Sequence, residues 1–543
     1  MPMAEGGVEL YHLGCGFADS RGATADIVGS KAANLFRLAA AGLPVPPGFV
    51  LPTGACREYL HAGRKLPDGF AERLKRHLQP VESVTGFTFG GDRRPLLVSV
   101  RSGAAVSMPG MMDTILNVGL CERTLPALLR MTGNPHHAWD SYRRLVQAYA
   151  EVVEGLSSQP FEKALTDYLQ REGVPSPREL DVTALKDLTA EFLAKFEAAA
   201  RKPFPQEPLV QLAGAVEAIF RSWESPRAVE YRRLHGLDHL AGTAALVQAM
   251  VFGNMGGTSG SGVAFTRDPS TGEKLLYLDF LWNAQGEDVV SGRCPVHSSA
   301  ALQQAMPPLY RELLRTSRQL EQLFGDVQDF EFTVQEGRLY LLQSRDAKRT
   351  PWAALRIACD LVGEGLIDPE QALHRLAGYD LQTIQSVRLA SGAELVPLCR
   401  GTPASPGAAV GEIALNPAAA VAAASAGRTP ILVRSDISPD DIAGLAVSAG
   451  VLTSLGGRTS HAAVVARQLN KVCIVGCQEL LIDANRRGCR LGEQWFHEGD
   501  FVSLDGSSGC VYPGKLEVVM EKPNDCLRQV ESWKGAHSEG AMA

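Results

Sequence analysis

The chain has 543 residues, so roughly three or four folding units are expected at about 150 residues each. Hydrophobic residues make up 45% and charged residues 21%, as in ordinary soluble proteins, and a net charge of −7 argues against DNA or RNA partners. We find no run of about 18 apolar residues that could cross a membrane, and we expect no signal peptide. Eleven cysteines without a C-x-x-C pair indicate reduced, mostly buried thiols in a cytoplasmic protein.

Strand and helix signals alternate at both ends of the first 345 residues, with a helical stretch between them. Residues 29–43 read as a glycine turn that enters an amphipathic helix, and residues 95–100 as a compact apolar strand. The pattern is helical from about residue 122 to residue 239. Strand and turn signals return in residues 253–281 and 325–345.

The remainder of the chain divides into three parts. Residues 346–388 read as a helical linker whose charged, proline-marked start is a plausible hinge. Short strands and helices alternate again over residues 389–514. Residues 515–543 are polar and are expected to form a helix followed by a frayed tail. Together these patterns predict a multidomain α/β protein.

The motif with the most chemistry is GGRTSH, from Gly456 to His461, which directly precedes the helical segment AAVVARQLN. The two glycines permit a tight turn, and Thr459 or Ser460 can cap a helix that starts at His461. The positive end of the helix dipole disfavours an imidazolium there, so the neutral ring can act as a nucleophile. A phosphate on that ring would face backbone N–H groups. The alternative is a histidine near a cap with no chemistry, and the residues alone leave both open.

A second cluster of polar side chains lies on an expected β-hairpin. Strand alternation places five of them on one face of their strands: Asp329, Glu331 and Thr333 on the first strand, Gln343 and Arg345 on the second. Carboxylates that converge with an amide suit Mg²⁺, which takes a few protein oxygens together with phosphate oxygens. The alternative is a solvated hairpin at the edge of a sheet.

A glycine-rich loop covers residues 253–262, with five glycines in ten residues beside Thr258, Ser259 and Ser261. Such a loop can bring its backbone N–H groups against phosphates because no Cβ stands in the way. It could equally be a flexible surface loop.

Longer segments resemble a known family. GGRTSHAAVVARQLNKVCIVG resembles the phosphohistidine domain of pyruvate phosphate dikinase, phosphoenolpyruvate synthase and sugar phosphotransferase-system enzyme I. VSVRSGAAVSMPGMMDTILNVGL, NAQGEDVVSG and QDFEFTVQEGRLYLLQSR resemble the nucleotide-binding domain of the dikinase. The likeness covers about residues 8–515. It implies an ATP-grasp domain over residues 1–345, with a helical insertion at about 122–239, and a swivelling α/β phosphohistidine domain over residues 389–514.

The resemblance also implies roles for individual residues. His461 would be the phosphorylated residue, and Arg101 would assist the transfer. The residues expected to contact ATP are Lys31, Arg101, Gly256, Thr258, Ser259, Gly260, Glu287, Asp329, Glu331, Gln343 and Arg345. Glu331 and Gln343 are the expected Mg²⁺ ligands.

The implied activity is dikinase-type autophosphorylation of His461 by ATP, which yields AMP. The residues after 515 leave no room for the C-terminal barrel that binds pyruvate or phosphoenolpyruvate in the family. We therefore expect an acceptor, pyruvate or an aromatic alcohol or phenol, on a partner subunit, as in split phenylphosphate or 4-methylbenzyl phosphate synthases. The alternatives are a pyruvate phosphate dikinase whose barrel is separate or removed, a stand-alone small-molecule kinase, and a non-catalytic nucleotide sensor.

Overall fold

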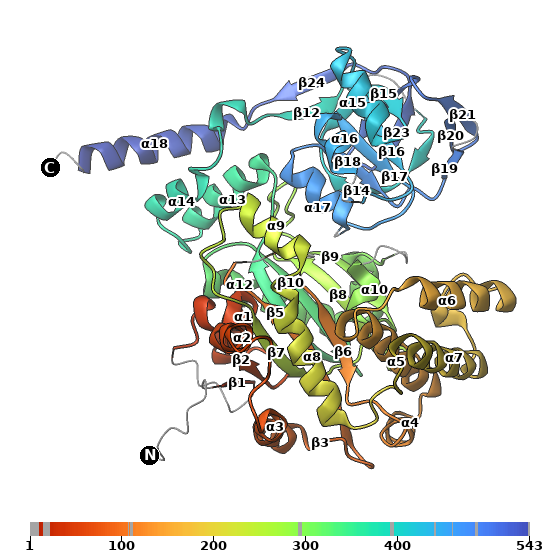
Figure 1. Ribbon diagram of the computed structural model, residues 1–543. Coiled ribbons are helices and arrows are strands. Elements are labelled where there is room, and N and C mark those ends of the chain that lie inside the picture. The colour runs from red at the N-terminus through yellow and green to blue at the C-terminus, as the bar shows by residue number, and fades with distance from the viewer. Residues whose placement is uncertain are drawn as a thin grey trace. The chain divides into compact units, whose positions relative to one another are not determined.

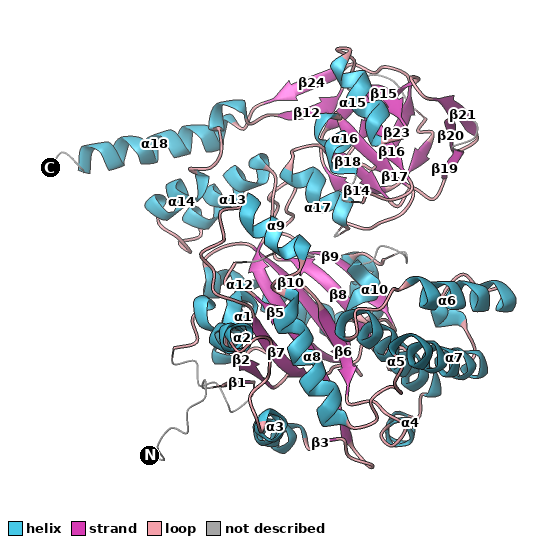
Figure 2. Cartoon of the chain, viewed as in Figure 1, coloured by secondary structure: helices cyan, strands magenta, loops and turns pink. Residues whose placement is uncertain are grey.

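The computed structural model describes residues 10–14, 22–106, 108, 112–290, 296–390, 396–438, 441–458, 460–483 and 487–540 (Figure 1). The chain forms two compact units. The first comprises Met1–Ser259 and Val334–Ser344, and the second comprises Gly260–Thr333 and Arg345–Ala543. Helices and strands are interspersed in both (Figure 2), so the prediction of a multidomain α/β protein is confirmed.

The first unit is built on a five-stranded sheet whose recorded strand pairs are all antiparallel. Its strands, in spatial order, are β1 (Tyr11–Leu13), β2 (Gly48–Leu51), β7 (Ala244–Ala249), β5 (Val98–Gly103) and β6 (Thr114–Val118). Every residue of β2 and β7 is buried, because helices and loops cover both faces of these strands. A short parallel pair, β3 (Thr88–Phe89) and β4 (Pro95–Leu96), lies apart from this sheet.

Helices surround this sheet and share one large apolar core with it. Those of the first unit are α1 (Ala25–Ala40), α2 (Thr53–His61), α3 (Phe70–Thr85), α4 (Leu125–Thr132), α5 (Pro135–Ala148), α6 (Gln159–Glu172), α7 (Val182–Ala200), α8 (Pro208–Ser222) and α9 (Pro226–Leu234). A π-helical turn (Tyr149–Val153) extends α5, and a 3₁₀ turn (Pro177–Glu179) precedes α7. Side-chain caps begin several of them: Asn134 accepts the N–H of His137 at α5, and Asp181 accepts that of Ala184 at α7.

The second unit contains a helical cluster and most of a four-stranded sheet; strand β11 of this sheet belongs mainly to the first unit. The sheet order is β11 (Arg338–Asp346), β10 (Gln328–Gln335), β8 (Gly260–Phe265) and β9 (Tyr277–Trp282). Three helices accompany it: α10 (Gly286–Val290), α11 (Ser299–Ala305) and α12 (Pro307–Phe324). The helical cluster consists of α13 (Pro351–Gly363), α14 (Pro369–Leu376) and α18 (Asn524–Gly540), which share a separate apolar core. A 3₁₀ turn (Leu381–Thr383) follows α14.

A two-stranded antiparallel ribbon leads from the helical cluster to the last domain. It pairs β12 (Ser386–Leu389) with β24 (Val518–Glu521), so the chain segments that enter and leave that domain run side by side. We call residues 399–513, between these two segments, the C-terminal sheet domain.

The C-terminal sheet domain contains an eight-stranded mixed sheet. In spatial order its strands are β13 (Cys399–Arg400), β23 (Cys510–Pro513), β22 (Phe501–Asp505), β15 (Ala408–Ala414), β16 (Pro430–Arg434), β17 (Gly450–Thr453), β18 (Val472–Val475) and β14 (Thr402–Ser405). The four central strands, β15 to β18, are parallel. A small sheet of β19 (Leu480–Asp483), β20 (Gly488–Leu491) and β21 (Gln494–His497) contributes to the core on one face.

Helices α15 (Pro417–Ser425), α16 (Ile442–Val447) and α17 (His461–Gln468) cover the other face. Alternate residues of the central strands separate these two cores: Leu432 and Val451 belong to the helical side, Val433 and Leu452 to the opposite side. This order of parallel strands and covering helices places the loop before α17 at the carboxyl end of β17, where ligands bind in open α/β sheets.

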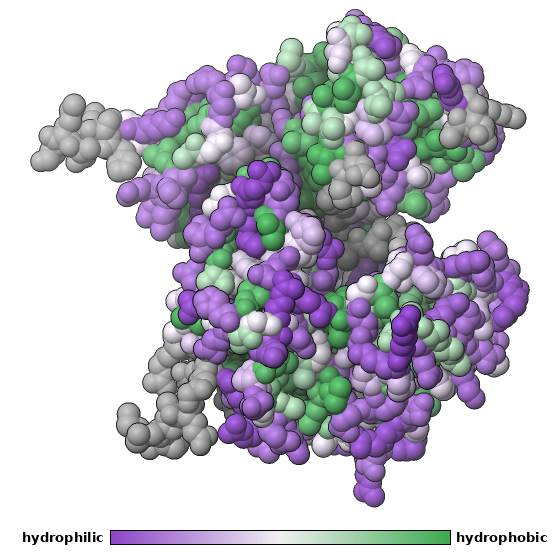
Figure 3. Space-filling view, in the orientation of Figure 1, coloured by the Kyte–Doolittle hydropathy of each residue, from purple (hydrophilic) through white to green (hydrophobic). Residues whose placement is uncertain are grey.

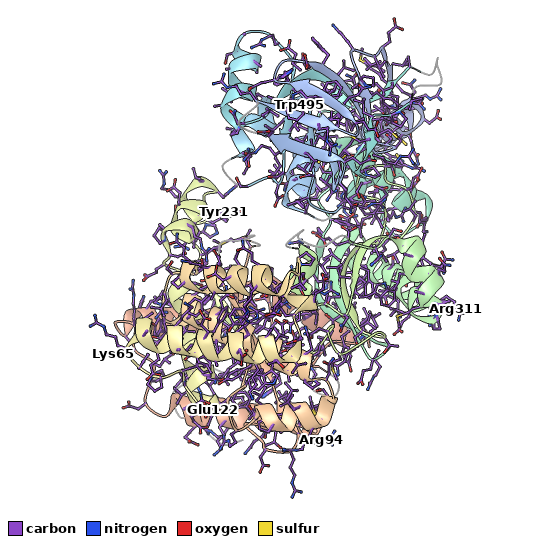
Figure 4. The ribbon with its side chains drawn as sticks, turned by 90° about the vertical axis from the view of Figure 1, so that its right-hand side faces the viewer. Lys65, Arg94, Glu122, Tyr231, Arg311 and Trp495 are labelled. Atoms are coloured by element: carbon purple, nitrogen blue, oxygen red, sulfur yellow. The ribbon has the colours of Figure 1, made fainter. Side chains whose placement is uncertain are left out.

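The exposed surface is mainly hydrophilic, and most of the described cysteines are buried. Figure 3 shows hydrophilic residues over much of the visible face with smaller hydrophobic patches, and exposed charged side chains such as Lys65 and Arg311 project outward in Figure 4. Of the nine cysteines among the described residues, eight are buried, as expected, and Cys526 is half-buried. No helix in the described part of the chain is long and apolar enough to cross a membrane.

Candidate functional site

Lys31 lies where the start of α1 runs beside the end of β5. Its ammonium donates to the carbonyl oxygen of Ser102, at 3.1 Å. The neighbouring Ser30 donates to the carbonyl oxygen of Ala104 from both its backbone N–H, at 2.8 Å, and its hydroxyl, at 3.1 Å. Gly29, with a φ of 79°, permits this approach, because a Cβ there would overlap the backbone of Gly103.

Arg101, one residue before Ser102, forms hydrogen bonds to β11, the second strand of the predicted hairpin. Its guanidinium donates to the carbonyl oxygen of Leu342 at 2.8 Å and to the side-chain oxygen of Gln343 at 3.5 Å. The amide of Asn34, on α1, donates to the carbonyl oxygen of Ser344 at 2.8 Å. The first unit therefore brings together Arg101 and Gln343, both predicted site residues, next to the segment that carries Lys31.

Two hydrogen bonds join the glycine-rich loop to the turn between β10 and β11. The N–H of Gly337 donates to the carbonyl oxygen of Thr258 at 2.9 Å, and the N–H of Glu336 donates to the hydroxyl of Ser259 at 3.0 Å. Ser259 is consequently buried, whereas Thr258 is exposed. Gly256 has a φ of 135°, and a Cβ there would meet no atom within 4 Å. Thr258 is therefore the solvent-exposed hydroxyl of the loop and a Cβ at Gly256 would meet open space, whereas the Ser259 hydroxyl holds the loop to the turn.

Asp329 is the most deeply buried carboxylate of the hairpin, with 6% of its surface exposed. One oxygen, Oδ2, accepts a hydrogen bond from Nε of Arg345 at 2.8 Å, and the other, Oδ1, has no hydrogen-bond partner. Burial raises the pKa of this carboxyl, and Glu331 raises it further, while Arg345 opposes the shift. A buried carboxylate oxygen without a donor fits a cation. The sequence placed the metal at Glu331 and Gln343, so this oxygen adds Asp329 to the candidate ligands.

The other side of β10 is apolar, as alternation predicted. Phe330 is fully buried, and Phe332 is 1% exposed. Because β10 lies between β11 and β8, it is an interior strand and not the solvated edge that the sequence left open. Among the described residues no three His, Cys, Asp or Glu side chains gather around a common metal position, so a cation here would need phosphate oxygens as well.

Two further predicted residues occupy separate places. Glu287 is exposed on α10, where the neighbouring Asp288 accepts the N–H of Gln285 at 3.0 Å. Gly260 begins β8 and is buried, because a Cβ there would overlap the ring of Phe280. A glycine is therefore required at position 260 because any larger residue would overlap Phe280, a packing requirement that the sequence alone does not reveal.

His461 is the first residue of α17, as predicted. Ser460 is the N-cap, and its hydroxyl accepts the N–H of Ala463 at 3.5 Å; Thr459, the other predicted cap, lies outside the described residues, as does the side chain of His461. Gly456 has a φ of 101°, and a Cβ there would lie 3.0 Å from the Ser460 hydroxyl oxygen. The fully buried alanines Ala462, Ala463 and Ala466 hold α17 close to the sheet.

Sequence reasoning missed the residues of β9 that contact the loop before His461. The hydroxyl of Tyr277 donates to the carbonyl oxygen of Pro403 at 3.2 Å, and the guanidinium of Arg458 lies 4.7 Å from the centre of the Tyr277 ring. A Cβ on Gly457 would stand 3.1 Å from Oδ2 of Asp279. Tyr277 and Asp279 share a face of their strand, and that period of two was the available signal.

Two family models match the chain. Residues 66–305 match "Pyruvate phosphate dikinase, AMP/ATP-binding domain", and residues 427–509 match "PEP-utilising enzyme, mobile domain". Strand β5, which carries Arg101, lies within the first match, and His461 lies within the second.

Curated relatives agree with these matches, and all three described here are named pyruvate, phosphate dikinase. The chain is 43% identical to the protein of Entamoeba histolytica over 93% of its own length and 57% of the relative. It is 42% identical to that of Rhizobium meliloti over 97% of its length and 43% identical to that of Clostridium symbiosum over 95%, in each case across 60% of the relative. It thus spans less than two thirds of the length of these relatives. The chain belongs to the pyruvate phosphate dikinase family.

Proposed function

We propose that this chain carries out the ATP-dependent half of a dikinase reaction, in which phosphate from ATP is transferred to His461 and then to an acceptor. The observation that carries the proposal is the position of His461, at the start of a helix that follows a parallel strand, in the segment that matches the mobile domain of PEP-utilising enzymes. The start of a helix favours a neutral imidazole before transfer and a phosphoryl group after it.

Lys31 and Arg101 are proposed to contact the phosphates of ATP, with the loop residues Gly256 and Thr258 covering them. The cations would neutralise charge that develops on the transferred group. The exposure of Thr258 supports this role, whereas Ser259 would act by holding the loop to its turn. Roles for Gly260 and Glu287 in ATP binding stay predictions from the sequence.

Mg²⁺ is proposed to be held by Glu331 and Gln343, with the partnerless oxygen of Asp329 as a further ligand. The ion would screen the negative charge of the phosphates from the incoming nucleophile. Arg345 would hold Asp329 in place through its hydrogen bond to the other carboxylate oxygen. Ionisation of Asp329 is needed for this role, and the ion would favour that form.

The chemical step is proposed to begin with attack by a neutral ring nitrogen of His461 on the β-phosphorus of ATP. The bond between the β-phosphorus and the bridging oxygen breaks, and AMP leaves with the electron pair. The terminal phosphoryl group then passes to inorganic phosphate or water, which leaves phosphohistidine for the acceptor.

The names of the relatives favour pyruvate as the acceptor. A partner subunit that binds the acceptor, and an aromatic alcohol or phenol in its place, stay predictions from the sequence. A cytoplasmic location is also a proposal, supported by the many buried thiols.

Incubation of the full chain with ATP labelled at the β-position, with Mg²⁺ and phosphate, tests the proposal. We expect an acid-labile, alkali-stable label that disappears in His461→Ala. The matched control is His497→Ala, which removes an exposed histidine from β21 of the same domain and should leave the label intact. A label that survives His461→Ala, or its absence from the wild-type chain, would refute the proposal. Transfer to added pyruvate, with and without candidate partners, then identifies the acceptor.

A further inference from the structure

Two cysteines from distant parts of the chain meet in the helical cluster. Cys359 lies on α13 and is 5% exposed, and Cys526 lies on α18 and is half-buried. The two residues are 167 positions apart, and the thiol of Cys359 donates to the carbonyl oxygen of Cys526 at 3.8 Å. A side-chain hydrogen bond also joins the two thiols. Because Cys359 belongs to the apolar core of the cluster and Cys526 packs against that core, the packing of the helices keeps the two sulfur atoms together.

The two thiols differ in their access to solvent and in their acidity. The side-chain hydrogen bond with Cys359 lowers the pKa of Cys526 to about 7, although burial opposes this shift, and the same bond raises the pKa of Cys359. Asp360 and Asp525 also oppose the shift at Cys526, whereas Arg356 supports it. The more exposed member of the pair is therefore the one that ionises first. A thiolate within reach of solvent, next to a second thiol, is the arrangement found in redox-sensing cysteines.

We propose that Cys359 and Cys526 are a reversible oxidation site, at which a hydroperoxide such as hydrogen peroxide converts the two neighbouring thiols into a disulfide that joins α13 to α18. This inference does not depend on the proposed phosphotransfer, because neither cysteine belongs to the proposed nucleotide site or to the segment around His461. Its oxidant is a small molecule that reaches Cys526 from solvent.

The chemical change takes place in two steps. The thiolate of Cys526 attacks one oxygen of the peroxide, the O–O bond breaks, and the leaving hydroxide takes up a proton to form water, which leaves a sulfenic acid on Cys526. The sulfur of Cys359 then attacks the sulfur of Cys526, the S–O bond breaks, and a second water leaves with the proton of the Cys359 thiol. Two thiols are oxidised, and one peroxide is reduced to two waters. An added thiol reverses the change by thiol–disulfide exchange.

The disulfide has a consequence for the whole second half of the chain. It closes residues 359–526 into one covalent loop, which contains both strands of the β12–β24 ribbon and the entire C-terminal sheet domain. In the reduced chain α18 is held to the cluster by apolar packing, through the buried Val530 and the partly buried Leu527 and Trp533. Oxidation makes this attachment covalent, so the start of α18 can no longer separate from α13.

A second pair of thiols provides a matched comparison within the same chain. A side-chain hydrogen bond also joins Cys399 and Cys477. These two residues are 4% and 0% exposed, and both lie in an apolar core of the C-terminal sheet domain. Since both thiols are withdrawn from solvent, peroxide should leave this pair reduced while the domain is folded.

Titration of the full chain with hydrogen peroxide tests the proposal. The chain is first reduced and separated from the reductant; after oxidation the remaining thiols are alkylated, and the chain is digested without reductant for mass spectrometry. We expect a cross-linked peptide pair that contains Cys359 and Cys526 and is two hydrogen atoms lighter than the reduced pair. It should be at least about tenfold more abundant than any disulfide that contains Cys399 or Cys477. Dithiothreitol should remove it, and the oxidised chain should migrate faster on a non-reducing denaturing gel.

Two variants separate the two steps. Cys359→Ser should stop at the sulfenic acid of Cys526, which dimedone traps, and Cys526→Ser should leave the buried Cys359 as a free thiol. A wild-type chain without the link between Cys359 and Cys526 would overturn the proposal, as would a link from Cys526 to any other cysteine in its place. A disulfide between Cys399 and Cys477 that forms equally readily would overturn it as well, because access to Cys526 would then not direct the oxidation.

Discussion

The α-carbon of Gly29 faces the backbone of Gly103 so closely that a side chain on Gly29 would overlap the carbonyl of Gly103. This approach joins the start of α1 to the end of β5. It also sets the positions of Lys31 and Arg101, each two residues from one of these glycines.

Gly29→Ala should therefore destabilise the first unit and weaken nucleotide binding together. The residue has a φ of 79°, which strains an alanine, and the overlap requires a backbone shift, so we expect a loss of about 2–4 kcal/mol. Urea denaturation and titration with ATP measure the two effects. Gly42→Ala is the matched control, because Gly42 has a φ of 74° with open space around it and should lose only about 1 kcal/mol. Equal losses in both variants would contradict the packing argument.

Asp329→Asn should separate stability from ligand binding. Burial raises the pKa of the Asp329 carboxyl, so the folded state holds its proton more tightly, and stability falls as pH rises through the ordinary range of a carboxyl. At pH 7 the amide removes this cost, and we expect an unchanged or slightly higher melting temperature without ligand. The affinity for Mg²⁺ and ATP together should fall at least about tenfold, which corresponds to about 1.4 kcal/mol less stabilisation by these ligands. A variant that binds Mg²⁺–ATP as the wild type does would exclude Asp329 as a ligand.

His137 should make the first unit sensitive to acid. The side chain is fully buried on α5 against Phe252, and burial lowers its pKa to about 4, despite the opposing effect of Asp140. The unfolded state therefore takes up a proton near pH 6.5 that the folded state accepts only near pH 4, so stability is lost as pH falls through this window. The loss approaches about 3 kcal/mol. His137→Phe should flatten the dependence of unfolding free energy on pH between 6.5 and 4.5, and an unchanged slope would contradict this assignment.

Cys526 should be the most reactive thiol among the described cysteines. It is half-buried at the start of α18. The neighbouring Cys359, whose thiol donates to the Cys526 carbonyl oxygen at 3.8 Å, lowers the pKa of the Cys526 thiol below that of a free cysteine. Alkylation by iodoacetamide should therefore have its midpoint at a lower pH than a free thiol. Cys359→Ala should move that midpoint upward. Cys473, whose pKa burial raises to about 12, is the internal control and should stay unlabelled in the folded protein.

Local patterns predicted a substantial part of the site. A period of two assigned Phe330 and Phe332 to one face of β10, and both are buried. A Thr-Ser pair followed by a run of small residues predicted a helix that begins at His461, capped by Thr459 or Ser460. Helix α17 does begin at His461, and Ser460 is its N-cap. These features depend on residues close together in the chain, which periodicity and capping chemistry can report.

Other parts of the site depend on contacts between distant residues. Arg101 and Gln343 are 242 positions apart, and Asn34 and Ser344 are 310 apart. Such relationships follow from the tertiary arrangement of strands and helices, and a single sequence does not display them.

The ribbon of β12 and β24 gives the C-terminal sheet domain a double tether. Four residue pairs bind the incoming strand to the outgoing one, and both continue into the same helical cluster. A domain held by one strand can spin freely about it, but two bonded strands must bend together. Any turning of this domain would therefore require both strands to bend at once, which would limit the directions in which the domain could turn.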